Sequence, residues 1–95
     1  MRIGIAEGAA GEILLTLGGS GIRLSRLQVQ NLLRELKHFF NGGVRSPMWL
    51  DEIDPNISVD WTENRIACRI RIGDGWWDVR PDDAQTVMGT LETLI

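Results

Sequence analysis

The chain has 95 residues, one cysteine and a formal net charge of −3 at pH 7, which fits one domain with a modest core and excludes an intramolecular disulfide. No apolar run approaches the roughly 18 residues of a membrane span, and the first residues lack the apolar segment of a signal peptide. We therefore expect a cytoplasmic protein, either of its own cell or of a host cell.

Three short strands are predicted before the first helix. Residues 2–6 and 12–17 alternate apolar with polar or small side chains, as half-buried strands do. Residues 18–21 are Gly-Gly-Ser-Gly, and a short strand over residues 22–24 follows. The glycine-rich segment lacks the Lys-Ser/Thr of a P-loop and the spacing of a dinucleotide fingerprint, so we interpret it as a hairpin turn.

The stretch 24–43 carries the strongest helix signal of the sequence. Its apolar residues recur at the spacing of one helical face: Val29, Leu32, Leu33, Leu36 and Phe40. Phe39 falls at the edge of that face. Ser25 and Gln28 have the spacing of a capping box at the helix start, and Gly42 is suited to a left-handed stop at its end.

The segment 42–56 is the least regular part of the chain, and it joins the two halves. It contains Trp49 followed by Asp51, Glu52 and Asp54. Two interpretations of Trp49 stay open: it closes the bottom of the core, or it anchors a partner, since tryptophan is enriched at interface hot spots. We predict that these four residues belong to a partner-binding surface, because long loops in compact domains are often functional.

After the linker, strands are predicted over residues 57–61, 66–72 and 76–80. Strict alternation places Trp61 and Ile66 among the inward-facing residues of these strands. Residues flanking the last two strands favour turns, and a Gly-Asp-Gly segment between them is typical of a tight hairpin.

The last predicted strand contains two adjacent tryptophans that point in opposite directions. Trp77 is expected to face inward and Trp76 outward, on the side that carries Arg71, where a cation–π contact is plausible. Pro81 then begins a final helix, and the two acids after it suit the positive end of the helix dipole. Gly89, in the middle of this helix, suggests close packing against a neighbouring element.

The sequence matches its own pattern when it is shifted by 55 residues, so that Leu17-Gly18 falls on Ile72-Gly73. We predict repeated (β)ββα units over residues 1–41 and 57–95, joined by the loop 42–56 into one domain. The expected fold is α+β: one antiparallel sheet of about five or six strands with both helices on one face. Five residues are predicted to be almost fully buried: Leu33, Leu36, Ile70, Trp77 and Leu91.

The residue types that most catalytic and metal sites need are scarce. His38 is the only histidine and is predicted on the polar side of the first helix, while Cys68, on the buried side of a strand, is predicted to be a core thiol. One His and one Cys cannot form a His/Cys zinc site, and no serine sits in a nucleophile elbow. We therefore expect no enzyme activity, no cofactor and no metal.

Charge is divided unequally between the two halves. Residues 1–48 carry six Lys/Arg and three Asp/Glu, whereas residues 49–95 carry four and ten. Such asymmetry is typical of electrostatically steered association, although two faces of a soluble domain also differ by accident. The overall negative charge argues against direct nucleic-acid binding.

The leading hypothesis is a small binding protein that blocks or modulates a macromolecular partner through an acidic, tryptophan-containing surface. The expected contact residues are Trp49, Asp51, Glu52, Asp54 and Trp76. Small phage inhibitors such as anti-CRISPR proteins, and immunity proteins that neutralise toxins, are similar in kind, although the sequence carries no family motif. The partner would then be a protein, either in a nucleic-acid-processing complex or a toxin, and not a membrane.

Two alternatives remain open from the sequence. One is a small-ligand or nucleotide-binding module in which Trp61, Trp76 and Trp77 line a site on the sheet, with Arg69 and Arg71 supplying positive charge. The other is a structural subunit that forms oligomers, the simplest of which is a homodimer.

Overall fold

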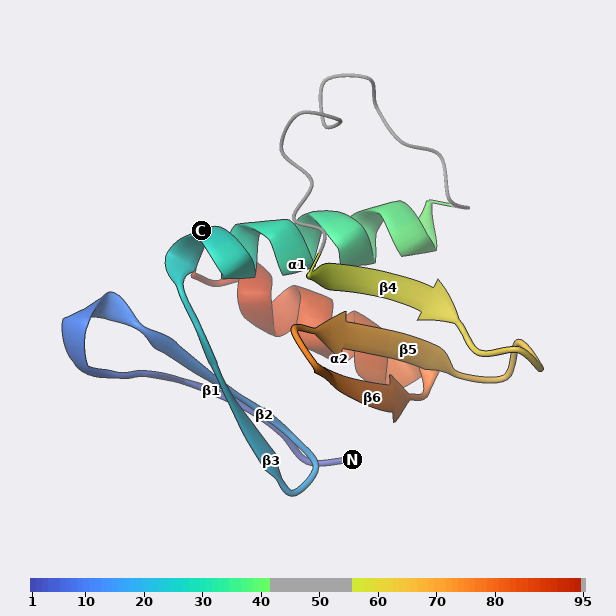
Figure 1. Ribbon diagram of the computed structural model, residues 1–95, viewed down its shortest axis with the longest axis horizontal. Coiled ribbons are helices and arrows are strands. Elements are labelled where there is room, and N and C mark those ends of the chain that lie inside the picture. The colour runs from blue at the N-terminus through green and yellow to red at the C-terminus, as the bar shows by residue number, and fades with distance from the viewer. Residues whose placement is uncertain (42–55, 95) are drawn as a thin grey trace.

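The computed structural model describes residues 1–41 and 56–94 and shows an α+β protein (Figure 1). The first antiparallel sheet and its helix are β1 (Ile3–Glu7), β2 (Ile13–Leu17), β3 (Ser20–Leu24) and α1 (Arg26–Phe40), with a short 3₁₀ turn, η1 (Ala9–Gly11), after β1. The second sheet and its helix are β4 (Ile57–Trp61), β5 (Cys68–Ile72), β6 (Gly75–Val79) and α2 (Pro81–Glu92). The predicted α+β class is confirmed.

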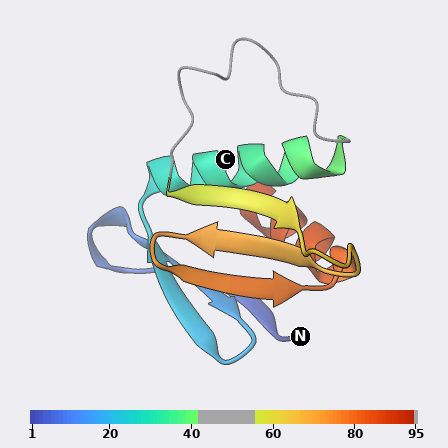
Figure 2. The same cartoon turned by 45° about the vertical axis from the view of Figure 1, so that its right-hand side comes forward.

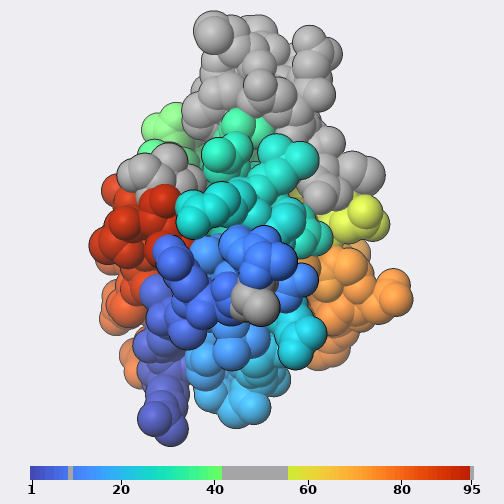
Figure 3. Space-filling view, turned by 90° about the vertical axis from the view of Figure 1, so that its left-hand side faces the viewer, coloured from blue at the N-terminus to red at the C-terminus, as the bar shows by residue number. Residues whose placement is uncertain are grey.

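The prediction of one sheet with five or six strands is wrong, because the described strands form two separate sheets of three. The reason lies at the sheet edges. Helix α1 lies beside β4, and α2 lies beside β1 (Figure 1). Figure 3 shows the second contact from the side, with the red residues of α2 against the blue N-terminal strands. Each helix therefore lies next to one edge strand of the other half, which leaves β3 and β6 as the edges that no helix of the other half is shown to cover.

The order of three strands and a helix occurs twice along the chain. The bounds of β2 and β3 recur 55 residues later as the bounds of β5 and β6. Both hairpins turn through a glycine in the left-handed region, with φ of +62° at Gly18 and +58° at Gly73. The glycine-rich segment is thus a hairpin turn, as predicted. That the two halves superpose stays a prediction.

Helix α1 begins with the predicted capping box. The backbone N–H of Gln28 donates to Ser25 Oγ at 3.1 Å, and the backbone N–H of Ser25 donates to Gln28 Oε1 at 2.8 Å. Phe39 is buried and Phe40 only half-buried, which reverses the predicted order of these two side chains. Asn41 is the C-cap residue. The predicted stop at Gly42 lies outside the described residues.

Both sheets and both helices contribute to one hydrophobic core. Four of the five residues predicted to be buried are confirmed: Leu33, Leu36, Ile70 and Leu91. Trp77 is only half-buried, because β6 is an edge strand and the indole lies across its own strand over Gly75. The predicted close packing at Gly89 is wrong, since a Cβ added there would meet nothing within 4 Å. Neither helix has both the length and the apolarity that crossing a membrane requires.

The connection between β4 and β5 is longer than predicted. Strand β5 begins at Cys68, and Ile66, predicted to be inward-facing, is 72% exposed in the turn before it. Side-chain hydrogen bonds hold this turn: Thr62 Oγ1 donates to Asn64 Oδ1 at 2.7 Å, and Thr62 Oγ1 accepts from the Ala67 N–H at 3.3 Å. Arg65 has φ of +57°, so the chain reverses before the alternation can extend to Ile66.

Candidate functional site

Trp76 is the predicted contact residue that the structure describes. It lies on β6, opposite Arg71 of β5, and its side chain is 55% exposed. Trp77, the next residue, faces the other side of the sheet and packs against the core. The predicted directions of the two tryptophans are therefore confirmed, and Trp76 presents a large aromatic surface on the outer face of the second sheet.

The outer face of the β4–β6 sheet is the side turned away from α2 and toward the viewer in Figure 2. Strand alternation places two cross-strand rows on it: Ser58, Arg71 and Trp76 in one, and Asp60, Arg69 and Asp78 in the other. We call these six residues the outer face. It combines one exposed aromatic ring with two arginines and two carboxylates.

Arg69 connects the two rows of the outer face. Its Nε donates to Asp78 Oδ1 at 2.8 Å and its Nη2 donates to Asp78 Oδ2 at 3.1 Å, a two-pronged ion pair. Its Cζ also lies 4.5 Å from the centroid of the Trp76 ring, within cation–π range. The hydrogen bond between the two side chains raises the pKa of Arg69 and lowers the pKa of the Asp78 carboxyl. Both groups therefore stay charged at neutral pH.

The predicted cation–π partner of Trp76 was Arg71, its neighbour in register, but the contact is made by Arg69. Asp78 explains the difference. It lies two residues after Trp76 on the same face of β6, and it draws the guanidinium of Arg69 onto that strand. Sequence periodicity identifies the face on which a side chain lies, but it does not identify which of two arginines an acid will position.

Trp61 lies on the predicted side of β4, but it is not buried there. Its side chain is 46% exposed, and its ring meets Phe39 of α1 at a centroid distance of 4.8 Å. Trp61 is the last residue of β4 and Phe39 is near the end of α1, so the ring has helix on one side only. Strand alternation predicts the direction of its side chain correctly, but at the end of β4 the described residues cover the ring only in part.

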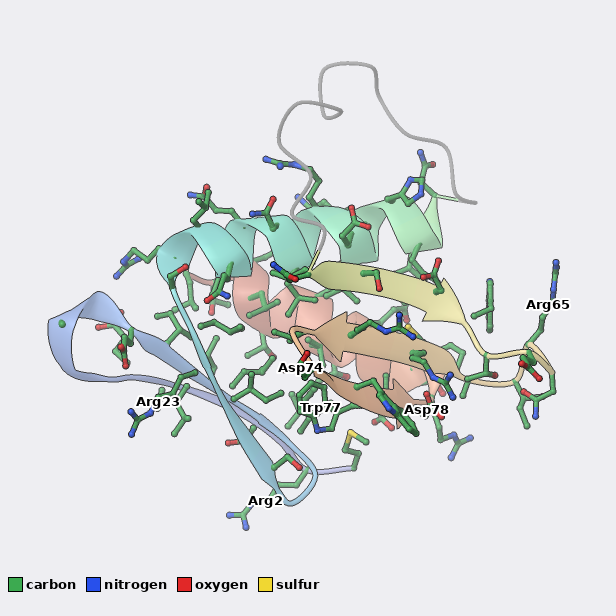
Figure 4. All side chains as sticks on the ribbon, in the orientation of Figure 1. Arg2, Arg23, Arg65, Asp74, Trp77 and Asp78 are labelled. Atoms are coloured by element: carbon green, nitrogen blue, oxygen red, sulfur yellow. The ribbon has the colours of Figure 1, made fainter. Side chains whose placement is uncertain are left out.

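The three tryptophans of the second half do not form one site. Trp76 lies on the outer face, Trp77 on the core side of the same strand, and Trp61 against the end of α1. Figure 4 shows Trp77 beneath the sheet, apart from the outer face. Of the two arginines proposed for an anion, Arg69 is already paired with Asp78.

The remaining predicted contact residues are Trp49, Asp51, Glu52 and Asp54. They lie outside the described residues, so the expectation that they bind a partner stays a prediction.

The lone thiol and the lone imidazole lie apart from the outer face. Cys68 is fully buried, which confirms a core position. The pKa of its thiol is raised to about 12. Burial is the largest cause, and the nearby carboxylates of Asp60 and Asp78 contribute the rest of this shift. His38 lies near the end of α1 with its Nδ1 buried, so it is less exposed than predicted. Among residues 1–41 and 56–94, no three His, Cys, Asp or Glu side chains gather as metal ligands would.

A groove of about 640 Å³ lies where the ends of α1 and β4 meet. Described residues from three segments line it: His38, Phe39, Val59, Asp60, Trp61, Thr62, Glu63 and Arg65. Its wall therefore includes the exposed ring of Trp61 and two carboxylates of the β4 end and the following turn. Sequence reasoning missed this groove, because it depends on how far α1 extends along β4.

Comparison of the chain with protein-family models, curated proteins and solved structures finds no match. The fold and the outer face define a small α+β domain with an ordered, exposed aromatic residue on a sheet.

Proposed function

We propose that this protein is a small, non-enzymatic binding protein that acts by occupying a surface of a macromolecular partner. An inhibitor of the kind exemplified by phage anti-CRISPR proteins or toxin-immunity proteins fits this description. The outer face supplies part of the contact surface, with Trp76 at its centre. The predicted contribution of Trp49, Asp51, Glu52 and Asp54, and the repeated (β)ββα construction, belong to the same proposal.

The observation that carries the proposal is the ordering of Trp76 by Arg69 and Asp78. An exposed aromatic ring on a sheet gains a defined orientation when a guanidinium packs against it and is itself fixed by a carboxylate. Aromatic residues that are ordered before binding lose little conformational entropy in a complex, and they are frequent hot spots. The charged residue next to the ring in register, Arg71, would then form part of a polar rim around it.

The small-ligand alternative receives less support from the arrangement of side chains. Its three tryptophans point to different places, and Arg69 is engaged by Asp78. A nucleotide site would need a concave surface on the outer face. The groove at the end of β4 does not include Trp76 in its lining.

Quantitative affinity capture tests the proposal. Tagged wild-type protein, Trp76→Ala and Leu27→Ala are used to recover proteins from lysates of candidate host cells, and recovery is measured by mass spectrometry. Leu27 is the matched control, because it is 66% exposed but lies on α1, away from the outer face. We expect a protein recovered by the wild type and by Leu27→Ala to be depleted at least tenfold with Trp76→Ala, the loss expected for a hot spot of about 2 kcal/mol. Equal recovery by all three folded proteins would exclude Trp76 as the contact.

A further inference from the structure

The groove at the ends of α1 and β4 lies at the end of an edge strand. In the second sheet β4 pairs with β5 on one side only. The Gly73 N–H donates to Asn56 O at 2.7 Å, and the Thr62 N–H donates to Ala67 O at 3.0 Å, so the pairs at even-numbered β4 positions are the hydrogen-bonded ones. By alternation, Val59 and Trp61 direct their backbone N–H and C=O groups away from β5.

These outward groups of β4 differ in accessibility along the strand. Val59 is buried beside α1, whereas Trp61 is exposed at the strand end. Beyond the pairing with β5, the described residues form no backbone hydrogen bond with Val59 or Trp61. The groove that contains Trp61 thus offers one backbone donor and one acceptor to an extended chain, the arrangement used when a peptide adds to a sheet edge.

The side chains around this edge favour a cation. The ring of Trp61 contacts Phe39 at a centroid distance of 4.8 Å, and Trp61 is 46% exposed. Asp60 and Glu63 flank Trp61 along the chain and line the same groove. Arg65, which also lines the groove, extends from the tip of the turn away from the sheet (Figure 4). An exposed aromatic ring in a groove that carboxylates also line is suited to a guanidinium or ammonium group.

The carboxylates at this end of the sheet affect the pKa values of two neighbouring groups. The carboxylate of Asp60 contributes to the raised pKa of the Cys68 thiol, after the larger effect of burial. Glu63 contributes to the raised pKa of Arg69, after the larger effects of Asp78. Asp60 and Glu63 are thus minor contributors to two shifts whose main causes are burial and the hydrogen bond with Asp78.

We propose that this groove docks a short extended segment of a protein partner that carries a lysine or arginine residue. The main chain of the segment pairs with the outward-facing backbone groups of Trp61, and its cationic side chain lies over the Trp61 ring in the groove that Asp60 and Glu63 also line. The inference rests on the proposed function in one respect, namely that the partner is a protein. It adds a second contact, distinct from Trp76, and the chemistry that this contact recognises.

Short peptides test the inference without a known partner. The ¹⁵N-labelled full-length protein is titrated with Ac-Ser-Arg-Ser-NH₂, with the neutral isostere Ac-Ser-citrulline-Ser-NH₂, and with Ac-Ser-Glu-Ser-NH₂. We expect the arginine peptide to produce saturable shifts in the Trp61 indole and backbone signals and in Thr62. Its affinity should exceed that of the citrulline peptide at least about threefold, as expected for one exposed cation–π contact, and the glutamate peptide should bind more weakly still.

Matched variants separate charge from main-chain pairing. The double variant Asp60→Asn/Glu63→Gln should reduce the preference for arginine over citrulline, whereas Asp74→Asn, at the opposite end of the sheet in Figure 4, should leave it unchanged. Methylation of the arginine backbone nitrogen in the peptide should weaken binding, because it removes a main-chain donor. Equal binding of all three peptides, or shifts confined to residues outside the groove, would overturn the inference.

The outcome is independent of the capture experiment. If the arginine peptide produces no shifts while Trp76→Ala still abolishes capture, the inference about the groove fails and the proposed function stands. If the peptide binds as described while Trp76→Ala leaves capture intact, the groove is retained and the role of the outer face is excluded.

Discussion

Arg69 and Trp76 are packed against each other diagonally across β5 and β6, with the guanidinium carbon 4.5 Å from the ring centroid. The same guanidinium is held by both carboxylate oxygens of Asp78, at 2.8 and 3.1 Å. Trp76 therefore depends for its orientation on an ion pair in which it takes no part. Loss of either charge should free the ring without removing it.

The first prediction concerns this ion pair and pH. The pKa of Asp78 is lowered from its ordinary value of 3.8, so the pair stabilises the folded protein above that value and the contribution is lost as pH falls through the folded-state pKa. Asp78→Asn should therefore lower the free energy of unfolding at about pH 7, and the difference from the wild type should vanish at about pH 2. Urea denaturation at both pH values measures the effect. A difference that is independent of pH would mean that the Asp78 carboxylate is not the stabilising group.

A second prediction concerns the buried face of α1. Leu36 is 0% exposed, and Leu36→Ala should lower the free energy of unfolding by about 2–5 kcal/mol, because it removes buried methyl groups and leaves a cavity. Leu27→Ala, on the exposed side of the same helix, should change it by less than about 0.5 kcal/mol. Both are measured by urea denaturation. An unchanged midpoint for Leu36→Ala would contradict the assigned core.

A third prediction concerns Gly75, over which the ring of Trp77 lies. A Cβ at Gly75 would stand 2.8 Å from Trp77 Cη2, closer than two carbon atoms approach. Gly75→Ala should displace the indole and lower the free energy of unfolding by about 1–3 kcal/mol, the usual effect of overpacking. In the Trp77→Leu background the same substitution should be nearly neutral. An equal decrease in the free energy of unfolding in both backgrounds would indicate that the strain arises in the backbone and not in the contact with Trp77.

Gly89 provides the opposite case. It lies inside α2, and a Cβ there would meet nothing within 4 Å. Gly89→Ala should raise the free energy of unfolding by about 1 kcal/mol, because alanine has the higher helix propensity. Thermal denaturation followed by circular dichroism measures the change. Destabilisation would indicate a close neighbour at this position that the described residues do not provide.

The fifth prediction concerns Cys68. Because burial raises the pKa of its thiol from 9.0 to about 12, the folded protein holds the thiol protonated at neutral pH and shields it from solvent. A thiol reagent such as Ellman's reagent should react at the rate of unfolding, and Leu36→Ala should accelerate the reaction. The unfolded state releases this proton more easily, so the folded state should also lose stability as pH rises above 9.0. Rapid labelling of the native protein would contradict both expectations.

Local chemistry made much of the fold predictable. The Ser25–Gln28 capping box depends on residues three apart, and the glycines at the hairpin turns are required by left-handed φ values. The division into two sheets was not predictable, because it depends on which element reaches the free edges of β1 and β4. Those edges are covered by helices from the other half, a non-local choice that no spacing in the sequence records.

The candidate site shows the same limit at the level of side chains. Alternation correctly places Trp76 outward, since its direction depends only on the strand to which it belongs. It also gives the correct direction for Trp61, but it does not predict the exposure of that residue, which depends on where α1 ends. Ile66 fails for a different reason, because the turn held by Thr62 and Asn64 takes it out of the strand.

The pairing of α1 with β4 and of α2 with β1 has a consequence for how the chain folds. Among residues 1–41 and 56–94, each half has an edge strand that the helix of the other half covers, and both halves contribute to one core. The two halves therefore pack against each other and share one core, and they are not independent modules. Folding must bring distant parts of the chain together before either sheet is protected, and two copies of the chain could satisfy the same contacts by exchanging halves.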